Sequence, residues 1–181
     1  LSLARDGRGN PFRFGLIGDS DTHNAAASHE EDNYTGKFAM ENDPRHRLDS
    51  TAAGMTPGQS QQVREFSSGG LAGVWAPENT REAIFAAMQR KETFGTSGPH
   101  IQVRFFGGWG FEATDAASGD VAAAGYRKGV PMGASLAPRG AAKAPTFLIA
   151  AAKDPGSGNL DRVQVIKGWV DAAGKSHDRI Y

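Results

Sequence analysis

The chain contains no cysteine and carries no net charge, since its 20 Lys and Arg residues balance its 20 Asp and Glu residues. The lack of cysteine excludes disulfide frameworks, thiol nucleophiles and zinc sites built on cysteine, and leaves the cellular compartment open. The balanced charge, with no basic stripe, argues against a dedicated nucleic-acid-binding protein. No apolar run approaches the roughly 18 residues that span a bilayer. We therefore expect a soluble protein without a transmembrane segment, which is cytoplasmic, periplasmic or secreted.

Large apolar side chains are also scarce. Leu, Ile, Val and Phe together make up 32 of 181 residues, while Gly and Pro contribute 33. The share of Leu, Ile, Val and Phe lies just under the roughly 20% below which disorder becomes a concern. Disorder also requires a high net charge, which is absent here. The composition predicts short elements, many turns and a thin core. The length suits one domain, or one small domain and part of another.

The first residue is Leu1, and no basic segment with an apolar core behind it precedes the globular sequence. These features predict that the chain is an internal or processed piece of a longer protein. A piece of this kind can hold only part of a functional site.

The first half of the chain is predicted to contain two short buried strands and one helix. The apolar runs at 12–17 and 70–76 predict the strands, and a polar, mostly irregular excursion is expected between about 25 and 62. A helix is expected from Asn79 or Thr80 to about Lys91, because either residue can cap it. Its predicted core-facing stripe consists of Ile84, Ala87 and Met88.

The second half is predicted to be all β. Strands are expected where apolar residues alternate or cluster between Gly- and Pro-rich turns, at 101–105, 110–114, 119–127, 146–152, 162–170 and 175–181. Short strands at regular spacing favour a β-sandwich. The fold class predicted is therefore α+β, with an α/β part over residues 1–95 and an antiparallel, sandwich-like β module over residues 96–181.

The densest set of reactive side chains follows the first predicted strand, in Gly18-Asp19-Ser20-Asp21-Thr22-His23-Asn24. Asp21 and His23 are two residues apart and would point to the same side of an extended backbone. A carboxylate and an imidazole in this arrangement suit a divalent metal such as Zn, Mn or Fe. The alternative is a polar turn in which Asp19 and Asp21 bond to backbone amides.

This segment resembles the Gly-Ser-Asp-x-His motif of the PHP (polymerase and histidinol phosphatase) family of metal-dependent phosphoesterases, which have a distorted β/α barrel. The stretch Gly70–Gly98 looks like the end of such a barrel. With Phe105-Phe106-Gly107-Gly108-Trp109, that stretch is similar to the uncharacterised bacterial family known as domain of unknown function 3604. Its matching motifs are Leu71-Ala72-Gly73-Val74-Trp75-Ala76, Arg81-Glu82-Ala83-Ile84 and Thr96-Ser97-Gly98-Pro99.

The resemblance implies a hydrolase with two or three metal ions, in which Asp21 and His23 are the last protein ligands along the chain. The other ligands of the family include a His-x-His pair, and none occurs in this sequence. We therefore expect the upstream part of the same polypeptide to be a partner of this chain. The fragment alone is expected to bind metal weakly and to be inactive, and its substrate is unknown.

The remaining histidines are harder to interpret. His100 stands where the resemblance leads us to expect Arg, so it is either structural, which we prefer, or an altered contact to substrate; Asn24 is a second candidate on the substrate side. His29, His46 and His177 lie in polar settings and are interpreted as solvated side chains. The acidic run 30–32 is interpreted as a solvated face, with the mouth of the site as the alternative.

Two other functions use the same residues differently. Gly18-Asp19-Ser20 resembles the nucleophile block of GDSL-type serine esterases, with Ser20 as nucleophile and Asp43 and His46 as its partners. Only about twenty residues separate these elements, and such families place the Asp-x-x-His block near the end of the chain. The second alternative is a non-catalytic β-sandwich that serves as a binding or structural module. A severed barrel would also expose apolar surface in the α/β part or bury it in a homo-oligomer.

Overall fold

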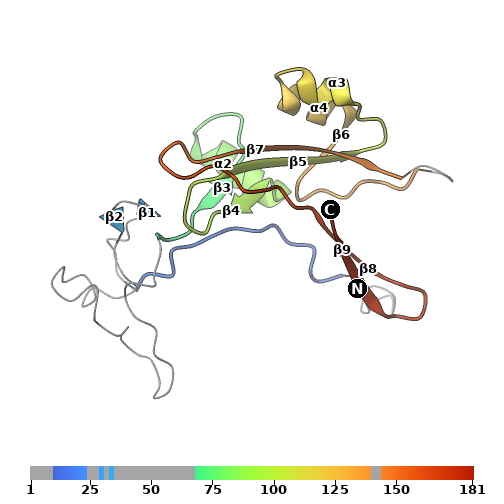
Figure 1. Cartoon of the computed structure of the whole chain (residues 1–181), viewed down its shortest axis with the longest axis horizontal. Coiled ribbons are helices and arrows are strands. Elements are labelled where there is room, and N and C mark those ends of the chain that lie inside the picture. The colour runs from blue at the N-terminus through green and yellow to red at the C-terminus, as the bar shows by residue number, and fades with distance from the viewer. Residues whose placement is uncertain (1–9, 24–28, 31–32, 35–67, 140–143) are drawn as a thin grey trace, which may run out of the picture.

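The structure is a computed structural model that describes residues 10–23, 29–30, 33–34, 68–139 and 144–181 (Figure 1). The elements in chain order are β1 (His29–Glu30), β2 (Asn33–Tyr34), β3 (Ala72–Val74), α2 (Arg81–Arg90), β4 (Thr93–Gly95), β5 (Gln102–Gly108), α3 (Ala113–Ala117), α4 (Val121–Lys128), β6 (Gly129–Pro131), β7 (Thr146–Ala152), β8 (Ile166–Val170) and β9 (Ser176–Ile180). The predicted α+β class is confirmed.

The strands form small antiparallel sheets. The pairs β1–β2, β3–β4 and β8–β9 are two-stranded, and β5 lies between β6 and β7 in a three-stranded sheet. The described residues form no closed barrel, and β3 and β4 are antiparallel although α2 connects them. The PHP-type barrel therefore stays a proposal, as does the boundary near residue 95. None of the helices in the described part of the chain is long and apolar enough to cross a membrane.

Helix α2 forms where the sequence predicts it. The Thr80 side chain accepts a hydrogen bond from the amide of Ala83, and Lys91 ends the helix in the left-handed conformation with φ of 63°. Of the predicted core stripe, Ala87 is buried and Ile84 is half-buried, whereas Met88 is 45% exposed. The helix thus packs through a narrower apolar face than its pattern predicts.

The core of the structure lies between the central sheet and helix α4. Strand β7 pairs with β5 along its whole length, from Gln102 opposite Ala152 to Gly108 opposite Thr146. Phe106, Ala124 and Leu148 form the buried cluster. Gly125 allows the helix to approach closely, because a methyl group there would lie 2.5 Å from the ring of Phe106. The thin core predicted from the composition is therefore this contact of one helix with one sheet.

The strands predicted at 110–114 and 119–127 are wrong, because α3 and α4 occupy these positions. Alanine has the highest helix propensity, and both helices are rich in it. Local caps add to this preference: the Asp120 carboxylate accepts from the amide of Ala123, and the Asp115 carboxylate accepts from that of Glu112. The part after residue 95 is consequently mixed α+β and not the predicted all-β module.

The strand predicted at 12–17 is also wrong. This segment contains no regular strand, and the side chains of Phe12, Phe14, Leu16 and Ile17 are 59–68% exposed. An apolar run becomes a buried strand only where other layers cover its side chains, and here these four side chains stay exposed although the backbone at Gly15 lies against Thr93. The expected exposure of apolar surface in the first half is therefore observed, whereas burial of that surface in a homo-oligomer stays a prediction.

Two side chains join the β3–α2–β4 unit to the central sheet. The indole of Trp75 donates a hydrogen bond to the carbonyl of Val103, and the Arg104 guanidinium lies 3.7 Å above the same indole. Glu92 is 2% exposed and accepts hydrogen bonds from Arg90 and from the Tyr126 hydroxyl. Burial, followed by the hydrogen bond to Glu92, raises the pKa of Tyr126 above its usual 10.0.

We expect Phe106→Ala to lower the free energy of unfolding by about 3–5 kcal/mol, because it removes the largest buried side chain and leaves a cavity beside Gly125. Phe12→Ala is the matched control, since Phe12 is 63% exposed, and should change the free energy by no more than about 0.5 kcal/mol. Urea unfolding followed by circular dichroism measures both. Equal effects would contradict the placement of the core.

Candidate functional site

The Gly18–His23 loop lies against the ends of β3 and β4. A methyl group added to Gly18 would lie 2.4 Å from the carbonyl oxygen of Thr96, and one added to Gly69 would lie 2.5 Å from Cβ of Ser20. The backbones are therefore so close that neither position has room for a side chain. The glycines place the predicted metal loop beside the end of the β3–β4 sheet.

Hydrogen bonds within the loop fix its conformation. The Ser20 and Thr22 hydroxyls are 3.0 Å apart, and the amide of Thr22 donates to the Ser20 hydroxyl. The Asp19 carboxylate accepts from the amide of Ser20 at 2.7 Å. The Asp19 contact is the one that the polar-turn alternative predicts for this residue, and it is compatible with metal ligation by other side chains of the loop.

Asp21 has a left-handed backbone conformation, with φ of 53°. For most L-residues this conformation costs roughly 1–2 kcal/mol, and Asp and Asn tolerate it best. Strained backbone of this kind occurs often at functional sites. In this loop it turns the chain between Ser20 and Thr22 and brings the carbonyl of Asp21 to the ring of His23.

The His23 ring is oriented by the backbone of Asp21. Its Nδ1 lies 3.0 Å from the Asp21 carbonyl oxygen. A carbonyl oxygen can only accept, so Nδ1 carries the proton and the lone pair of the neutral imidazole lies on Nε2. Histidines that bind metals in proteins commonly have this arrangement, in which the second ring nitrogen donates to a carbonyl or carboxylate.

Asp21 and His23 are both exposed. Within the described ranges, neither belongs to a group of three His, Asp or Glu side chains whose ligand atoms lie close enough for one metal ion. Their assignment as ligands therefore stays a prediction. It requires further ligands from elsewhere in the protein, as the PHP resemblance implies.

The residues needed by the serine-esterase alternative cannot be placed together. Asp43 and His46 lie outside the described residues, as does the substrate-side candidate Asn24. The hydrogen bonds of the Ser20 hydroxyl described above are with Thr22. The alternative stays a prediction.

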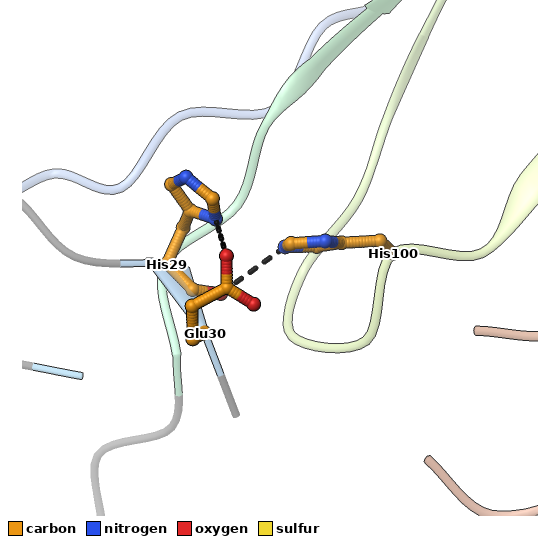
Figure 2. A group of neighbouring side chains, drawn as sticks. All are labelled: His29, Glu30 and His100. Carbon is orange, nitrogen blue, oxygen red and sulfur yellow. Dashed lines mark hydrogen bonds and ion pairs between the residues drawn. The ribbon is translucent and has the colours of Figure 1, made fainter. Parts of the chain in front are cut away.

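A second group of potential ligands, His29, Glu30 and His100, comes from two distant parts of the chain. His29 and Glu30 form β1, and His100 lies in the loop that leads into β5; Figure 2 shows their side chains converging. The Nδ1 atom of His29 is 3.3 Å from a carboxylate oxygen of Glu30. Nε2 of His100 is 3.1 Å from the carbonyl oxygen of His29, and the two imidazole rings are 5.0 Å apart.

One ligand atom from each of these three residues lies within 4.8 Å of the others. The Nδ1 atom of His29 is buried, and no hydrogen bond from a described residue satisfies it, although a carboxylate oxygen of Glu30 lies 3.3 Å away. Two imidazoles and a carboxylate form a donor set typical of Zn²⁺ and of Fe²⁺.

Asp154 holds the backbone of His100 in place. One carboxylate oxygen accepts from the amide of His100 at 2.8 Å, and the other accepts from the amide of Gly156 at 2.9 Å. These two hydrogen bonds, with that of His100 the stronger influence, lower the pKa of Asp154 below 3.8. The turn that follows β7 is thereby tied to the loop that precedes β5.

No sequence pattern predicts this group. His29 is expected to be a solvated side chain, and its side chain is indeed 42% exposed, but its ring also lies 5.0 Å from that of His100. Adjacent residues of a strand point to opposite faces, so the His29-Glu30 pair is no signal for a shared site. The contact of His100 with the His29 carbonyl supports the structural interpretation of His100.

His177 lies in the separate β8–β9 hairpin. Its Nε2 is 2.8 Å from a carboxylate oxygen of Asp171, and its ring stacks on that of Trp169 at 5.3 Å. The hydrogen bond from His177 is the largest of the effects that lower the pKa of Asp171. His177 is therefore a paired side chain of a hairpin and not the freely solvated residue that was expected.

The family model described as "Protein of unknown function (DUF3604)" matches residues 1–181, which is the whole chain. The chain belongs to the DUF3604 family. No curated protein and no solved structure matches it. Membership in DUF3604 confirms the narrower part of the resemblance seen in the sequence, whereas the relation to PHP enzymes and their reaction stays a proposal.

The lowered pKa of Asp154 predicts how this DUF3604 chain responds to acid. Because the folded state takes up this proton less readily than the unfolded state, the carboxylate contributes stability above pH 3.8, and the contribution is lost as the pH falls through the lower, folded-state pKa. Asp154→Asn removes it, since an asparagine does not titrate and its single acceptor oxygen can accept from only one of the His100 and Gly156 amides. Urea unfolding at pH 7, 4 and 3 should show a destabilised variant whose deficit shrinks with acid. A constant deficit would contradict the assignment.

Proposed function

We propose that this chain is part of a PHP-like, metal-dependent hydrolase of the phosphoesterase type, in which Asp21 and His23 supply two of the metal ligands. The observation that supports this best is the hydrogen bond from Nδ1 of His23 to the Asp21 carbonyl. It fixes the tautomer in which Nε2 has the lone pair that a metal needs.

The donor set fits a divalent metal but does not complete a site. Asp21 would contribute an anionic oxygen and His23 a neutral nitrogen, and this combination suits Zn, Mn or Fe. Catalytic zinc sites use three protein ligands and structural sites four, so two residues are too few. The remaining ligands would come from the upstream part of the polypeptide, which is consistent with the exposed positions of Asp21 and His23.

The roles of the residues follow from their positions. When bound, metal ions would supply a water of lowered pKa and polarise an oxygen of the substrate. The αL conformation of Asp21 would hold its carbonyl against the His23 ring, so that the ligand geometry is set before metal arrives. Gly18 and Gly69 would keep the loop pressed onto the β3–β4 unit.

The proposal predicts that Asp21→Ala/His23→Ala lowers the metal content of the protein that includes the upstream region. Hydrolysis of phosphomonoester and phosphodiester test substrates should fall by about 100-fold or more, because ligand geometry is lost. Mass spectrometry of the metals and a chromogenic phosphate assay measure the two effects. His177→Ala/Asp178→Ala is the matched control, since it removes the same two side-chain types from β9.

Unchanged metal content in the Asp21/His23 variant would overturn the ligand assignment. Turnover that survives chelation and is abolished by Ser20→Ala would favour the serine-esterase alternative instead. If chelation and both substitutions leave a binding activity intact and no turnover is found, the non-catalytic module is the better description.

A further inference from the structure

We propose that His29, Glu30 and His100 form a zinc-binding site that is separate from the Asp21/His23 loop and does not depend on the function proposed above. The site would fasten the β1–β2 hairpin to the loop that precedes β5. Three features support this site: the types of ligand atom, the distances between these atoms and the surroundings of each side chain.

The distances are close to those that zinc requires. Zn–N and Zn–O bonds of about 2.0–2.2 Å place the ligands of a tetrahedral ion roughly 3.3–3.5 Å apart. His29 Nδ1 and the Glu30 carboxylate are already 3.3 Å apart, and all three ligand atoms lie within 4.8 Å of one another. Closing the group around an ion therefore requires movements of no more than about 1.5 Å.

The buried Nδ1 of His29 is the independent sign of a ligand. No hydrogen bond from the described residues reaches this atom, although it faces the Glu30 carboxylate (Figure 2). A buried polar atom without a hydrogen bond costs free energy, and such atoms are uncommon in folded proteins. Coordination of an ion shared with Glu30 would satisfy it.

Hydrogen bonds of its backbone and its ring fix the position of His100. Its amide is bound to Asp154, and its Nε2–H donates to the His29 carbonyl, so the lone pair of the neutral ring lies on Nδ1. An ion could bind at Nδ1 of His100, and the hydrogen bond from Nε2 to the His29 carbonyl would then remain as the second contact of a ligating histidine. Alternatively, an ion at Nε2 would replace that hydrogen bond. Asp154 is thus a positioning residue for the site.

The types of ligand atom indicate which metal ion would bind. Two imidazoles and one carboxylate favour Zn²⁺ over Mg²⁺ and Ca²⁺, which prefer oxygen ligands. Three protein ligands leave a fourth position open. Because the residues come from β1 and from the loop at His100, bound zinc would stabilise the folded chain, and the gain would rise with the logarithm of the zinc concentration once this exceeds the dissociation constant.

The test is calorimetric titration of the 181-residue chain with Zn²⁺ after removal of metal by a chelator, accompanied by the absorption spectrum with Co²⁺. We expect one equivalent of Zn²⁺ to bind with micromolar or tighter affinity and to raise the melting temperature, and Mg²⁺ to do neither. His100→Arg and Glu30→Gln should each weaken this binding at least about 100-fold, because arginine has no lone pair to offer and an amide is a poor ligand.

Two control variants distinguish this zinc site from the metal ligands proposed at Asp21 and His23. His177→Ala removes a histidine from the β8–β9 hairpin and should bind like the wild type. Asp21→Ala/His23→Ala should keep the zinc equivalent assigned here, even if it loses metal at the loop. Wild-type affinity in both His100→Arg and Glu30→Gln would overturn the proposal, as would millimolar binding only or equal binding of Mg²⁺. Circular dichroism establishes that each variant is folded.

Discussion

The buried carboxylate of Glu92 is the interaction on which the arrangement of the two halves depends. A charge removed from water is tolerated only when it is paired and hydrogen-bonded. Glu92 meets this condition through Arg90, in its own half, and through Tyr126 on α4. The backbone of Glu92 contributes as well, because its carbonyl oxygen accepts a hydrogen bond from the amide of Trp75. The Gly18–His23 loop therefore lies on a unit whose position relative to α4 and the central sheet is set by charge as well as by packing.

The parts of the fold that were predicted correctly are those with a local cause. Helix α2 has its cap at Thr80, and β7 has an unbroken apolar run, so both were found, the strand with its observed bounds. Helices α3 and α4 also have local causes, in their alanines and in the Asp120 cap, but Val121 and Tyr126 made the segment resemble a strand. The apolar surface expected in the first half could not be assigned to Phe12 in advance, because the exposure of this residue depends on which other parts of the chain cover it.

The candidate ligands also differ in whether a local pattern in the sequence could predict them. Asp21 and His23 are two residues apart, so their spacing alone suggests a shared task, and the turn that joins them is local. His29 and His100 are 71 residues apart. Only the folding of the β1–β2 hairpin against the loop before β5 brings them together, and no pattern along the chain encodes that contact. The Asp154 hydrogen bond to His100 depends on tertiary structure for the same reason.

The environment of Trp75 has a practical consequence. Its indole contacts the guanidinium of Arg104 and the ring of Phe94, and its N–H donates to the carbonyl of Val103, three residues beyond His100. The emission of an indole is sensitive to nearby charge and to the loss of a hydrogen bond. In a variant that lacks Trp109 and Trp169, Trp75 is therefore a fluorescent probe of the contact between the β3–α2–β4 unit and β5, and it reports on movements of the loop at His100 without an added label.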